Sequence, residues 1–529
     1  MDFIHSKISI ESILNSNIGN KWYPNKMVRD YLLGKDISDI YTSLPDISSF
    51  PKAIKAKENK GINRKLLVDV LTSQYGNCSS IPSGIKELGK ENCFTVTTGH
   101  QLSLFTGPLF FIYKIISTIN LSETLKNVFP NYEFVPVFWM ASEDHDFEEI
   151  NHINIYGKKL EWKDFQGGAV GRYSTDTINH IVKDLSELLG DDKTVASILS
   201  AYENNTTLVE ATREIVHQLF GKYGLVVIDG DDKRFKSQFS DVLKDELKGI
   251  SNGLIEGFSK NIEKKYPIQA MTRPLNVFYL QDGSRDRIIR NENDGFSLVN
   301  KNVQWNENQL LELIDSHPES FSPNVLLRPL YQEFLLPNVA YTGGPSELAY
   351  WFQLKTLFSN YSIPFPVLIP RKSVLILGKK DAGKIKSLGI KAFDLQLDEG
   401  TLIKKVIKQK SNIDLDNEKH AIEKIVNEIV SKIKETDPSL EGTVNAEKVK
   451  WLKGLAKLES KLNKSEKKKH ETSINQLLKL KEKLFPNQSL QERHDNILPF
   501  ISNYGIEFID VLKKLIDPLE KDILLIEED

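Results

Sequence analysis

The segment Thr98-Gly99-His100-Gln101, followed by Thr106-Gly107-Pro108, has the residue types of an anion-binding turn. Glycine lets a ligand approach the backbone, and free N–H groups at a helix start favour a phosphate or a carboxylate. His100 could stabilise a phosphoryl group as an imidazolium or donate a hydrogen bond to it. A tight turn with a capping histidine is the alternative interpretation.

A second polar cluster, Glu143-Asp144-His145-Asp146, is followed by Asn151 and His152. Four consecutive ionisable groups could bind an ammonium group, hold Mg²⁺ or act as a general base. The spacing of the two histidines matches no zinc signature. An acidic helix N-terminus, favoured by the helix dipole, is the structural alternative.

A third cluster extends from Ser322 to Trp351. Arg328 can hold a carboxylate or a phosphate in bidentate fashion. Gly343-Gly344-Pro345 predicts a flexible turn before a helix, and Glu347 and Trp351 would share one face of that helix. Structural prolines and glycines explain part of this stretch, but they do not explain its combination of charged and amide side chains.

The segment Gly378–Lys384 has the spacing of a phosphate-binding P-loop, but Ile385 replaces the Ser or Thr that would bind Mg²⁺. We therefore interpret it as an ordinary join between a strand, Val374–Leu377, and a helix. The sequence contains no Gly-x-Ser-x-Gly elbow and no Gly-x-Gly-x-x-Gly fingerprint.

The elements that must position the first two clusters are a strand, a helix and a second strand. The β-branched and aromatic run Cys93–Thr97 predicts a buried strand, a helix follows from Thr106-Gly107-Pro108 towards Asn127, and Phe134–Met140 predicts the next strand. Both clusters then follow the carboxyl ends of parallel strands, where open α/β sheets bind ligands. Further strands of this sheet are predicted at 224–229, 276–280 and 365–369.

The rest of the chain reads mainly as helix. Residues 1–74 predict helices broken by Pro24, Pro45 and Pro51. After about residue 400, apolar residues at helical spacing (422–433 and 449–462) predict two long helices, the second reaching Leu484, in an antiparallel coiled coil. The basic run Lys467–Lys469 is interpreted as a solvated face, and residues 505–526 predict a final helix packed on the body.

Composition narrows the class of protein. The 529 residues carry a net charge of −3, with 40% hydrophobic and 27% charged residues, as in an ordinary globular enzyme. Near-neutrality argues against a nucleic-acid partner. Two cysteines fit a reducing cytoplasm, no secretory signal is visible, and the most apolar stretch, 104–119, is too short to span a membrane and contains Lys114.

The stretches TTGHQLSLFTGPLFFIYK, PVFWMASEDHDFEEIN, SPNVLLRPLYQEFLLPN and YTGGPSELAYW resemble the BshC family, the cysteine ligases of bacillithiol biosynthesis. The resemblance covers separate blocks from about Thr97 to Arg371, and Leu490–Arg493 and Tyr504-Gly505 also look like that family.

The resemblance implies an α/β fold: a Rossmann-like parallel sheet core similar to class I nucleotidyltransferases and aminoacyl-tRNA synthetases, with inserted connecting segments. It also implies a C-terminal coiled coil that forms a homodimer. Thr98-Gly99-His100-Gln101 only echoes the His-x-Gly-His signature of that class. The predicted segments are 1–90 (helical), 91–160 and 321–398 (the two halves of the core), 161–320 (core strands with insertions), 399–490 (coiled coil) and 491–529 (C-terminal helix).

The implied reaction joins the carboxyl group of L-cysteine to the amine of glucosaminyl-malate, the last step of bacillithiol synthesis. Activation by ATP or another nucleotide is expected, and the sequence leaves open whether Mg²⁺ is required and whether the intermediate is an acyl adenylate or an acyl phosphate. Glu143, Asp144 or Asp146 would bind the ammonium group or act as base, Arg328 would hold the malate or a phosphate, and His100 with the Gly107 turn would hold activating phosphate.

The candidate catalytic residues are His100, Glu143, Asp144, His145 and Asp146, and the candidate substrate- or phosphate-binding residues are Thr98, Gly99, Gln101, Thr106, Gly107, Pro108, Lys114, Asn151, Arg328, Glu333, Asn338, Gly343, Gly344, Glu347 and Trp351. No structural metal site is predicted. The competing interpretations are another acyl- or nucleotidyl-transferring enzyme, a coiled-coil scaffold, and a tRNA-associated protein that binds RNA along its lysine-rich helix.

Overall fold

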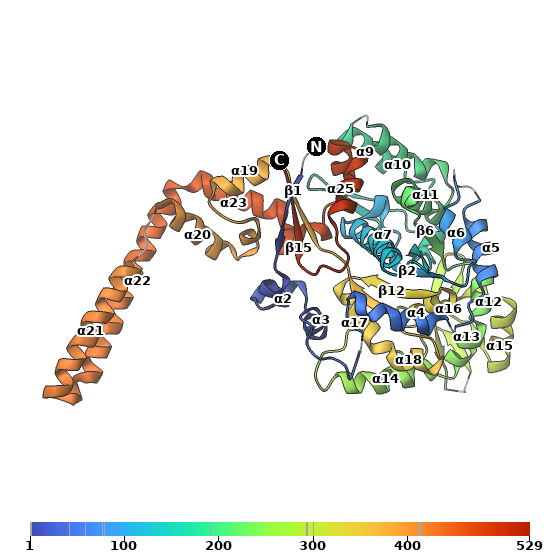
Figure 1. Ribbon diagram of the computed structural model, residues 1–529, viewed down its shortest axis with the longest axis horizontal. Helices are drawn as coiled ribbons and strands as arrows, with labels where there is room; N and C mark the ends of the chain where they lie inside the picture. The colour runs from blue at the N-terminus through green and yellow to red at the C-terminus, as the bar shows by residue number, and fades with distance from the viewer. Residues whose placement is uncertain are drawn as a thin grey trace. The chain divides into compact units, whose positions relative to one another are not determined.

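The computed structural model describes residues 3–41, 43–58, 60–76, 78, 80–190, 192–292, 295–299, 301–411 and 415–529 (Figure 1). Met1 and Asp2, which belong to the predicted N-terminal helical segment, lie outside the described residues. The chain forms two compact units: the larger comprises His5–Leu375 and Glu492–Leu525, and the smaller is built mainly from Ile376–Gln491.

A five-stranded parallel sheet organises the larger unit. Its order is β13-β12-β2-β3-β6, with β13 Val367–Pro370, β12 Asn338–Gly343, β2 Cys93–His100, β3 Glu133–Met140 and β6 Val226–Asp229. The predicted strands at 93–97, 134–140, 224–229 and 365–369 are thus confirmed as members of one parallel sheet. Helix α7 (Phe110–Val128) connects β2 to β3 and packs against both.

The core of this unit forms around β2, β12 and β13, which are buried along nearly their whole length and contribute apolar side chains to it. Phe94 and Val96 of β2 pack in one cluster with Leu121 and Leu125 of α7. The same cluster contains Phe50, Ile54, Phe134, Val339, Ala340, Val367 and Ile369. It anchors the strands whose carboxyl ends carry the candidate site.

The expectation that residues 276–280 extend the parallel sheet is wrong. They form β7 (Val277–Gln281), which pairs antiparallel with β8 (Ser284–Arg290) and β11 (Phe321–Pro323). This second sheet has the order β10-β9-β8-β7-β11, with β9 Phe296–Leu298 and β10 Gln304–Trp305. A buried apolar run predicts a strand but not its partners, because pairing is decided by the neighbouring hairpins.

The remaining helices of the larger unit are α1 Ile10–Leu14, α2 Asn17–Trp22, α3 Lys26–Leu32, α4 Phe50–Glu58, α5 Arg64–Gln74, α6 Ser83–Glu87, α8 Phe147–Ile150, α9 Asn179–Leu189, α10 Lys193–Asn204, α11 Leu208–Phe220, α12 Lys233–Gln238, α13 Ser240–Leu247, α14 Ile250–Ile262, α15 Glu307–Ser316, α16 Arg328–Leu335, α17 Pro345–Trp351, α18 Lys355–Asn360, α24 Leu498–Tyr504 and α25 Glu507–Leu515. A short hairpin, β4 His152–Ile155 and β5 Lys158–Glu161, lies between α8 and α9 in the chain.

The two ends of the chain differ from the prediction. The N-terminal segment begins with a strand, β1 (Phe3–Ile8), before its helices, and Pro51 lies in the first turn of α4, where a missing N–H costs little, so it does not break that helix. The segment predicted as a final helix contains α25 but ends in β15 (Ile523–Glu528). β15 lies between β1 and β14 (Val374–Leu377) in a three-stranded sheet. Its strand conformation therefore depends on pairing with β1, which lies at the other end of the sequence.

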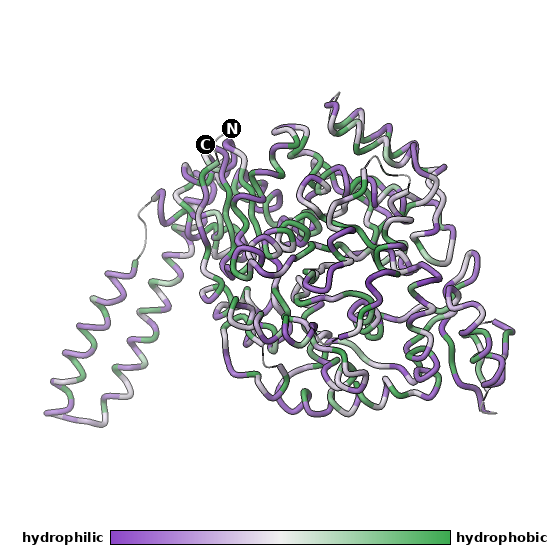
Figure 2. The backbone as a smooth tube through the Cα atoms, turned by 45° about the vertical axis from the view of Figure 1, so that its right-hand side comes forward, coloured by the Kyte–Doolittle hydropathy of each residue, from purple (hydrophilic) through white to green (hydrophobic). Residues whose placement is uncertain are grey.

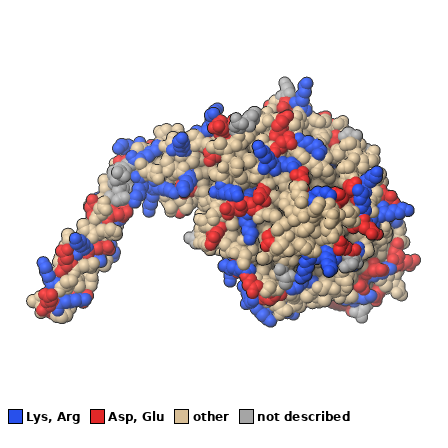
Figure 3. Space-filling model, in the orientation of Figure 1, with Lys and Arg blue, Asp and Glu red and all other residues tan. Residues whose placement is uncertain are grey.

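The smaller unit contains the predicted helical hairpin. Helices α21 (Asp416–Thr436) and α22 (Glu441–Lys469) run antiparallel, as the ion pair between Lys419 and Glu459 at 2.8 Å and that between Lys434 and Glu441 at 3.2 Å require. Figure 3 shows both signs of charge along the hairpin, and Figure 2 shows hydrophobic residues recurring along each helix.

The second long helix is not continuous to Leu484. It ends at Lys469, and α23 (Glu471–Leu484) follows after His470, whose backbone leaves the regular helical conformation. The other helices of this unit are α19 (Lys379–Ser387) and α20 (Glu399–Ser411). α19 follows β14 through Gly378, so the predicted strand–helix join is confirmed.

Within the described residues, the helices are too short or too polar for any of them to cross a lipid bilayer.

We expect the larger unit to be strongly destabilised when one partner of the buried ion pair between Lys57 and Glu333 is removed. The charged atoms are 2.7 Å apart, and the two side chains are 1% and 0% exposed. Lys57→Ala leaves the Glu333 carboxylate buried without its counter-ion, which destabilises folded proteins by about 3–5 kcal/mol. Urea unfolding measures this change. Lys90→Ala, which breaks an exposed pair with Glu87, is the control; an equal effect of both variants would contradict the prediction.

Candidate active site

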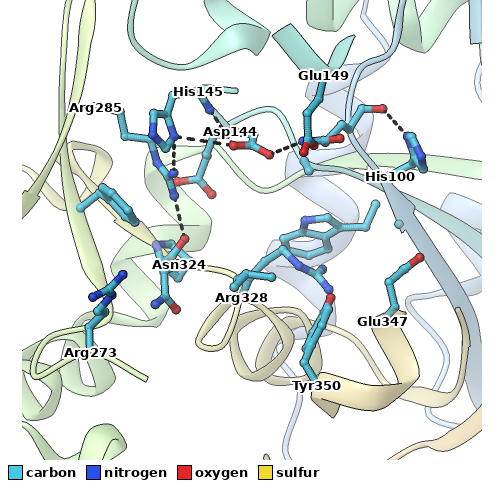
Figure 4. A pocket seen from close by; sticks show the side chains of 18 of the residues that line it. His100, Asp144, His145, Glu149, Arg273, Arg285, Asn324, Arg328, Glu347 and Tyr350 are labelled. Carbon is cyan, nitrogen blue, oxygen red and sulfur yellow. Dashed lines mark hydrogen bonds and ion pairs between the residues drawn. The ribbon is translucent and has the colours of Figure 1, made fainter. Parts of the chain in front are cut away.

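A cavity of about 630 Å³ lies at the carboxyl edge of the parallel sheet (Figure 4). One wall comes from residues at and after the ends of β2 and β3, and another from β7, β8 and the segment around Asn324. The predicted site residues that line it are Gly99, His100, Gln101, Lys114, Glu143, Asp144, His145, Arg328 and Glu347. The fold therefore brings parts of all three sequence clusters to one place.

His100 is the last residue of β2 and packs against the rings of Phe110 and Phe111 at centroid distances of 5.2 and 5.3 Å. Its Nδ1 lies 2.9 Å from the carbonyl oxygen of Gln101, so Nδ1 carries the proton and Nε2 the lone pair. Burial, reinforced by the charge of Lys114, lowers the pKa of His100 to about 4. The side chain is neutral at pH 7, which disfavours the imidazolium role considered from the sequence.

Asp144 is held by donors on two sides. Gln101 Nε2 donates to Asp144 Oδ2 and to Glu149 Oε2, both at 2.7 Å, and the backbone N–H of His145 donates to Asp144 Oδ1 at 2.7 Å. Burial acts to raise the pKa of Asp144, but these hydrogen bonds and the charge of Arg285 outweigh it and hold the pKa well below its usual range. Asp144 is therefore a fixed anion in the cavity wall.

Glu143 forms an ion pair with the buried side chain of Lys236. Lys236 Nζ is 2.7 Å from a Glu143 oxygen and 2.7 Å from an Asp231 oxygen, and Arg172 reaches Asp231 from the other side at 2.7 Å. Burial raises the pKa of Glu143, while Lys236 opposes that shift. Lys236 and Asp231 were not predicted as site residues, because nothing in the sequence spacing connects them to Glu143.

Lys114 and Glu347 form the opposite part of the cavity wall. Their charged atoms are 2.5 Å apart, Lys114 Nζ also donates to the carbonyl of Gly99 at 2.9 Å, and Tyr341 Oη donates to Glu347 at 2.8 Å. Burial lowers the pKa of Lys114, while Glu347 acts to raise it. The pair joins the end of β2 to the start of α17.

Arg328 is the first residue of α16 and lines the cavity beside Tyr350. Its Nη1 donates to Gln332 at 3.0 Å, and its guanidinium lies 5.9 Å from the ring centroid of Tyr341. Among the described residues no carboxylate lies within ion-pair distance of it. It can therefore offer its remaining N–H groups to an anion.

Three further arginines line the cavity and were missed: Arg273, Arg285 and Arg287. Arg285 and Arg287 lie two apart in β8, so the period of a strand places them on the same face. Only the fold brings that face to the cavity, since β8 is far in sequence from the three clusters.

Several predicted residues hold the fold together instead of lining the cavity. Asn338 accepts hydrogen bonds from Thr95 and Thr97, and its amide donates to Glu333, which also pairs with Lys57. Thr98 donates to the carbonyl of Thr342. These polar groups satisfy one another inside the sheet, because unpaired buried polar groups are costly. Trp351 is buried and stacks on Tyr341 at 4.4 Å.

The turn of Thr106, Gly107 and Pro108 also lies outside the cavity lining. Asn496 donates to the carbonyls of Phe105 and Gly107, and the N–H of Leu109 donates to Asp495. Helix α7 begins at Phe110, two residues after the predicted start at Pro108. Gly107 has a φ of 61°, and a Cβ there would lie 2.5 Å from Ser103, so its glycine serves this turn.

The other predicted residues serve local structure. Gly343 and Gly344 precede α17, and the N–H of Gly344 donates to Glu347 at 3.2 Å. Asp146 is exposed at the start of α8, and Asn151 is buried at the end of that helix, where its N–H donates to the carbonyl of Phe147 and its carbonyl accepts from the N–H of Trp162. No group of three or more metal-ligating side chains is arranged to hold an ion in the described parts of the chain.

The protein has a parallel α/β sheet, a charged cavity at the carboxyl edge of that sheet, and an added helical hairpin. These features define a Rossmann-like protein that acts on small, charged molecules. The family model "Bacillithiol biosynthesis BshC, N-terminal Rossmann-like domain" matches residues 12–372, and "Bacillithiol biosynthesis BshC, C-terminal coiled-coil domain" matches residues 374–528. The chain therefore belongs to the BshC family, and the Rossmann-like core and coiled coil expected from the resemblance are confirmed.

Relatives align over nearly the whole chain. A protein of Flavobacterium psychrophilum named "Putative cysteine ligase BshC" is 40% identical over 94% of this chain and 96% of its own length. A protein of the same name from Flavobacterium johnsoniae is 39% identical over 95% of this chain and 97% of its own. A solved "putative arginyl t-RNA synthetase" from Campylobacter jejuni aligns with 85% of this chain and 97% of its own at 10% identity and a TM-score of 0.25, which does not define a common fold.

We expect the imidazole of His100 to titrate near pH 4, because burial disfavours its charged form. NMR of histidine-labelled protein measures this, and the signal absent from His100→Asn assigns it. In the unfolded chain this imidazole takes up its proton at about pH 6.5, and in the folded chain only near pH 4. The free energy of unfolding therefore decreases as the pH falls from about 6.5 towards 4, because only the unfolded state gains the proton in that range. A midpoint above pH 6 for the assigned signal would contradict the prediction.

Proposed function

We propose that this protein is a ligase that joins the carboxyl group of L-cysteine to the amine of glucosaminyl-malate, completing bacillithiol synthesis in the cytoplasm. Membership of the BshC family and the names of the relatives support the cysteine ligase activity. The observation that carries the substrate assignment is the cavity itself, in which fixed carboxylates and arginines without a close ion pair in the described chain line one space. Such a cavity suits substrates that bear both ammonium and carboxylate groups.

Joining a carboxylate to an amine in water requires activation of the carboxylate, which ATP or another nucleotide with Mg²⁺ would supply. Arg328 lies between the two sides of the cavity and forms no close ion pair with a carboxylate of the described chain. It is therefore well placed to hold the negative charge of the activated group. The nucleotide and its cleavage products are part of the proposal.

The pKa values of Asp144 and Glu143 are shifted in opposite directions, which suits the two carboxyl groups to different roles. Asp144 stays ionised, so it suits binding of an ammonium group, and Glu149 adds a second carboxylate through Gln101. Glu143, whose pKa burial raises, is better matched to accept the proton that the amine releases as the amide bond forms. His100 acts as a neutral hydrogen-bonding group beside them.

Mass spectrometry of purified protein incubated with L-cysteine, glucosaminyl-malate and one nucleotide at a time tests this function. The expected product is the cysteinyl amide, and the nucleotide product distinguishes an adenylate route, which releases AMP and pyrophosphate, from a phosphate route, which releases ADP and phosphate. Absence of the amide with every nucleotide would refute the proposal.

We expect Asp144→Asn to lower the rate of amide formation by about 100-fold or more, because it removes the fixed negative charge from the cavity. The initial rate of bacillithiol formation at saturating substrates measures this. Glu148→Gln, an exposed residue in the same segment that does not line the cavity, is the control and keeps the wild-type rate. Normal thiol levels in cells whose only copy carries Asp144→Asn would contradict the assignment.

We also propose that the helical hairpin makes the protein a homodimer. Large apolar side chains of α22 are exposed along one stretch: Val449 is 50% exposed, Trp451 44%, Leu458 55% and Leu462 39%. Ile425 of α21 is 52% exposed. Exposed apolar residues repeated along a two-helix hairpin are typical of a surface that packs against another helix.

Trp451→Glu combined with Leu458→Glu should convert a dimer to a monomer, because both substitutions place charge in the buried seam of the dimer. Light scattering after size-exclusion chromatography measures the mass. Lys453→Glu combined with Lys457→Glu introduces the same side chains at exposed positions of the same helix and should leave the mass unchanged. A monomeric wild-type protein would refute the proposal.

A further inference from the structure

We infer that Arg273, Arg285 and Arg287 form a binding site for a small dicarboxylate, which in the proposed reaction is the malyl group of glucosaminyl-malate. We call these three residues the arginine wall. The inference rests on the proposed function for the identity of the ligand, but the site itself follows from three arginines that line one cavity and from the surroundings of Arg285 and Arg287.

The arginine wall forms no close ion pair within the described chain, although the charge of Arg285 acts on Asp144 at longer range. Among the residues that the structure describes, no carboxylate lies within ion-pair distance of its three guanidinium groups. The acids of the same cavity have partners: Glu143 pairs with Lys236, and Glu347 pairs with Lys114. The positive charge of Arg273 and Arg287 is therefore left for an anion from solution, while that of Arg285 also acts on Asp144.

Arg285 is held in place by its neighbours. Its Nη1 lies 2.9 Å from His145 Nδ1, so only part of the guanidinium remains for a ligand. Its Nε and Nη2 donate to Ser322 Oγ at 3.1 and 3.0 Å, and Nη2 also donates to the carbonyl of Pro323 at 3.0 Å. Its guanidinium stacks 4.0 Å from the ring centroid of Phe278. These contacts fix the plane of the guanidinium, so binding costs little side-chain entropy.

Arg287 has an unfilled hydrogen-bonding position that faces this cavity. It lines the same cavity two residues further along β8, and its Nε is buried without a hydrogen-bond partner. A buried donor without an acceptor costs free energy, which a bound carboxylate would recover. Residues two apart in a strand are separated by about 6.8 Å, a span that the two ends of a four-carbon dicarboxylate can occupy.

The position of the wall favours the carboxylates of the sugar substrate over the phosphates of a nucleotide. In doubly wound folds phosphates bind at the carboxyl ends of the parallel strands, which here is the side of His100. Figure 4 shows Arg273 and Arg285 on one side of the cavity and His100 and Glu347 on the other, with Arg328 and Asn324 between them. The two ends of the cavity thus suit different anions.

Titration calorimetry with L-malate, glucosaminyl-malate and inorganic phosphate tests the inference on wild-type protein and on Arg287→Gln. We expect both malyl compounds to bind wild-type protein and to lose about 10-fold or more affinity in Arg287→Gln, because a charge-assisted hydrogen bond is lost. Arg287→Lys, which keeps the charge without the planar fork, should retain an intermediate affinity. Arg290→Gln, on the opposite face of β8 and away from the cavity, should bind as wild type.

Kinetics supply a second readout. Arg287→Gln should raise the KM for glucosaminyl-malate while leaving the KM for L-cysteine unchanged. Unchanged affinity of Arg287→Gln for both malyl compounds would overturn the inference, as would phosphate binding that depends on Arg287 as strongly as malate binding does. Malate binding that depends on Arg287, in a protein that forms no amide, would refute the proposed function and leave the dicarboxylate site standing.

Discussion

The charge balance beneath the cavity is the constraint on which the site depends. Several ionised groups lie where the surroundings exclude much of the water, and each such group is costly unless a partner is close. Lys236 compensates Glu143 and Asp231, and Lys114 compensates Glu347. These two lysines allow the cavity wall to contain buried carboxylates at fixed positions.

The same pairs join elements that are distant in sequence. Lys114 belongs to α7 and Glu347 to α17, and the pair also holds the carbonyl of Gly99 at the end of β2. Lys236 belongs to α12 and reaches the segment after β3. The ion pairs therefore position the site and stabilise the sheet edge at the same time, which is why removing one partner would affect both.

The cavity combines two kinds of wall. The parallel sheet contributes carboxylates and a neutral histidine, whereas the inserted antiparallel sheet contributes arginines without close ion pairs in the described chain. Charges of both signs in one cavity can orient a substrate that has both an ammonium and a carboxylate group. A cavity with both kinds of charge suits a ligase that must bring an amine and an activated carboxyl group together.

Much of this protein could be read from its sequence, because local patterns carry it. Buried apolar runs and the turns after them predicted β2, β3 and the cluster from Glu143 to Asp146, and amphipathic spacing predicted the hairpin of α21 and α22. The sequence could not separate Glu347, which lines the cavity, from Glu333, which is buried with Lys57, because both are acidic residues of one stretch. It also gave no sign of Arg285 and Arg287, whose relation to the site depends on the pairing of β7 with β8 and β11. Tertiary structure decided those points, because ion pairing and strand pairing act between residues that no local pattern connects.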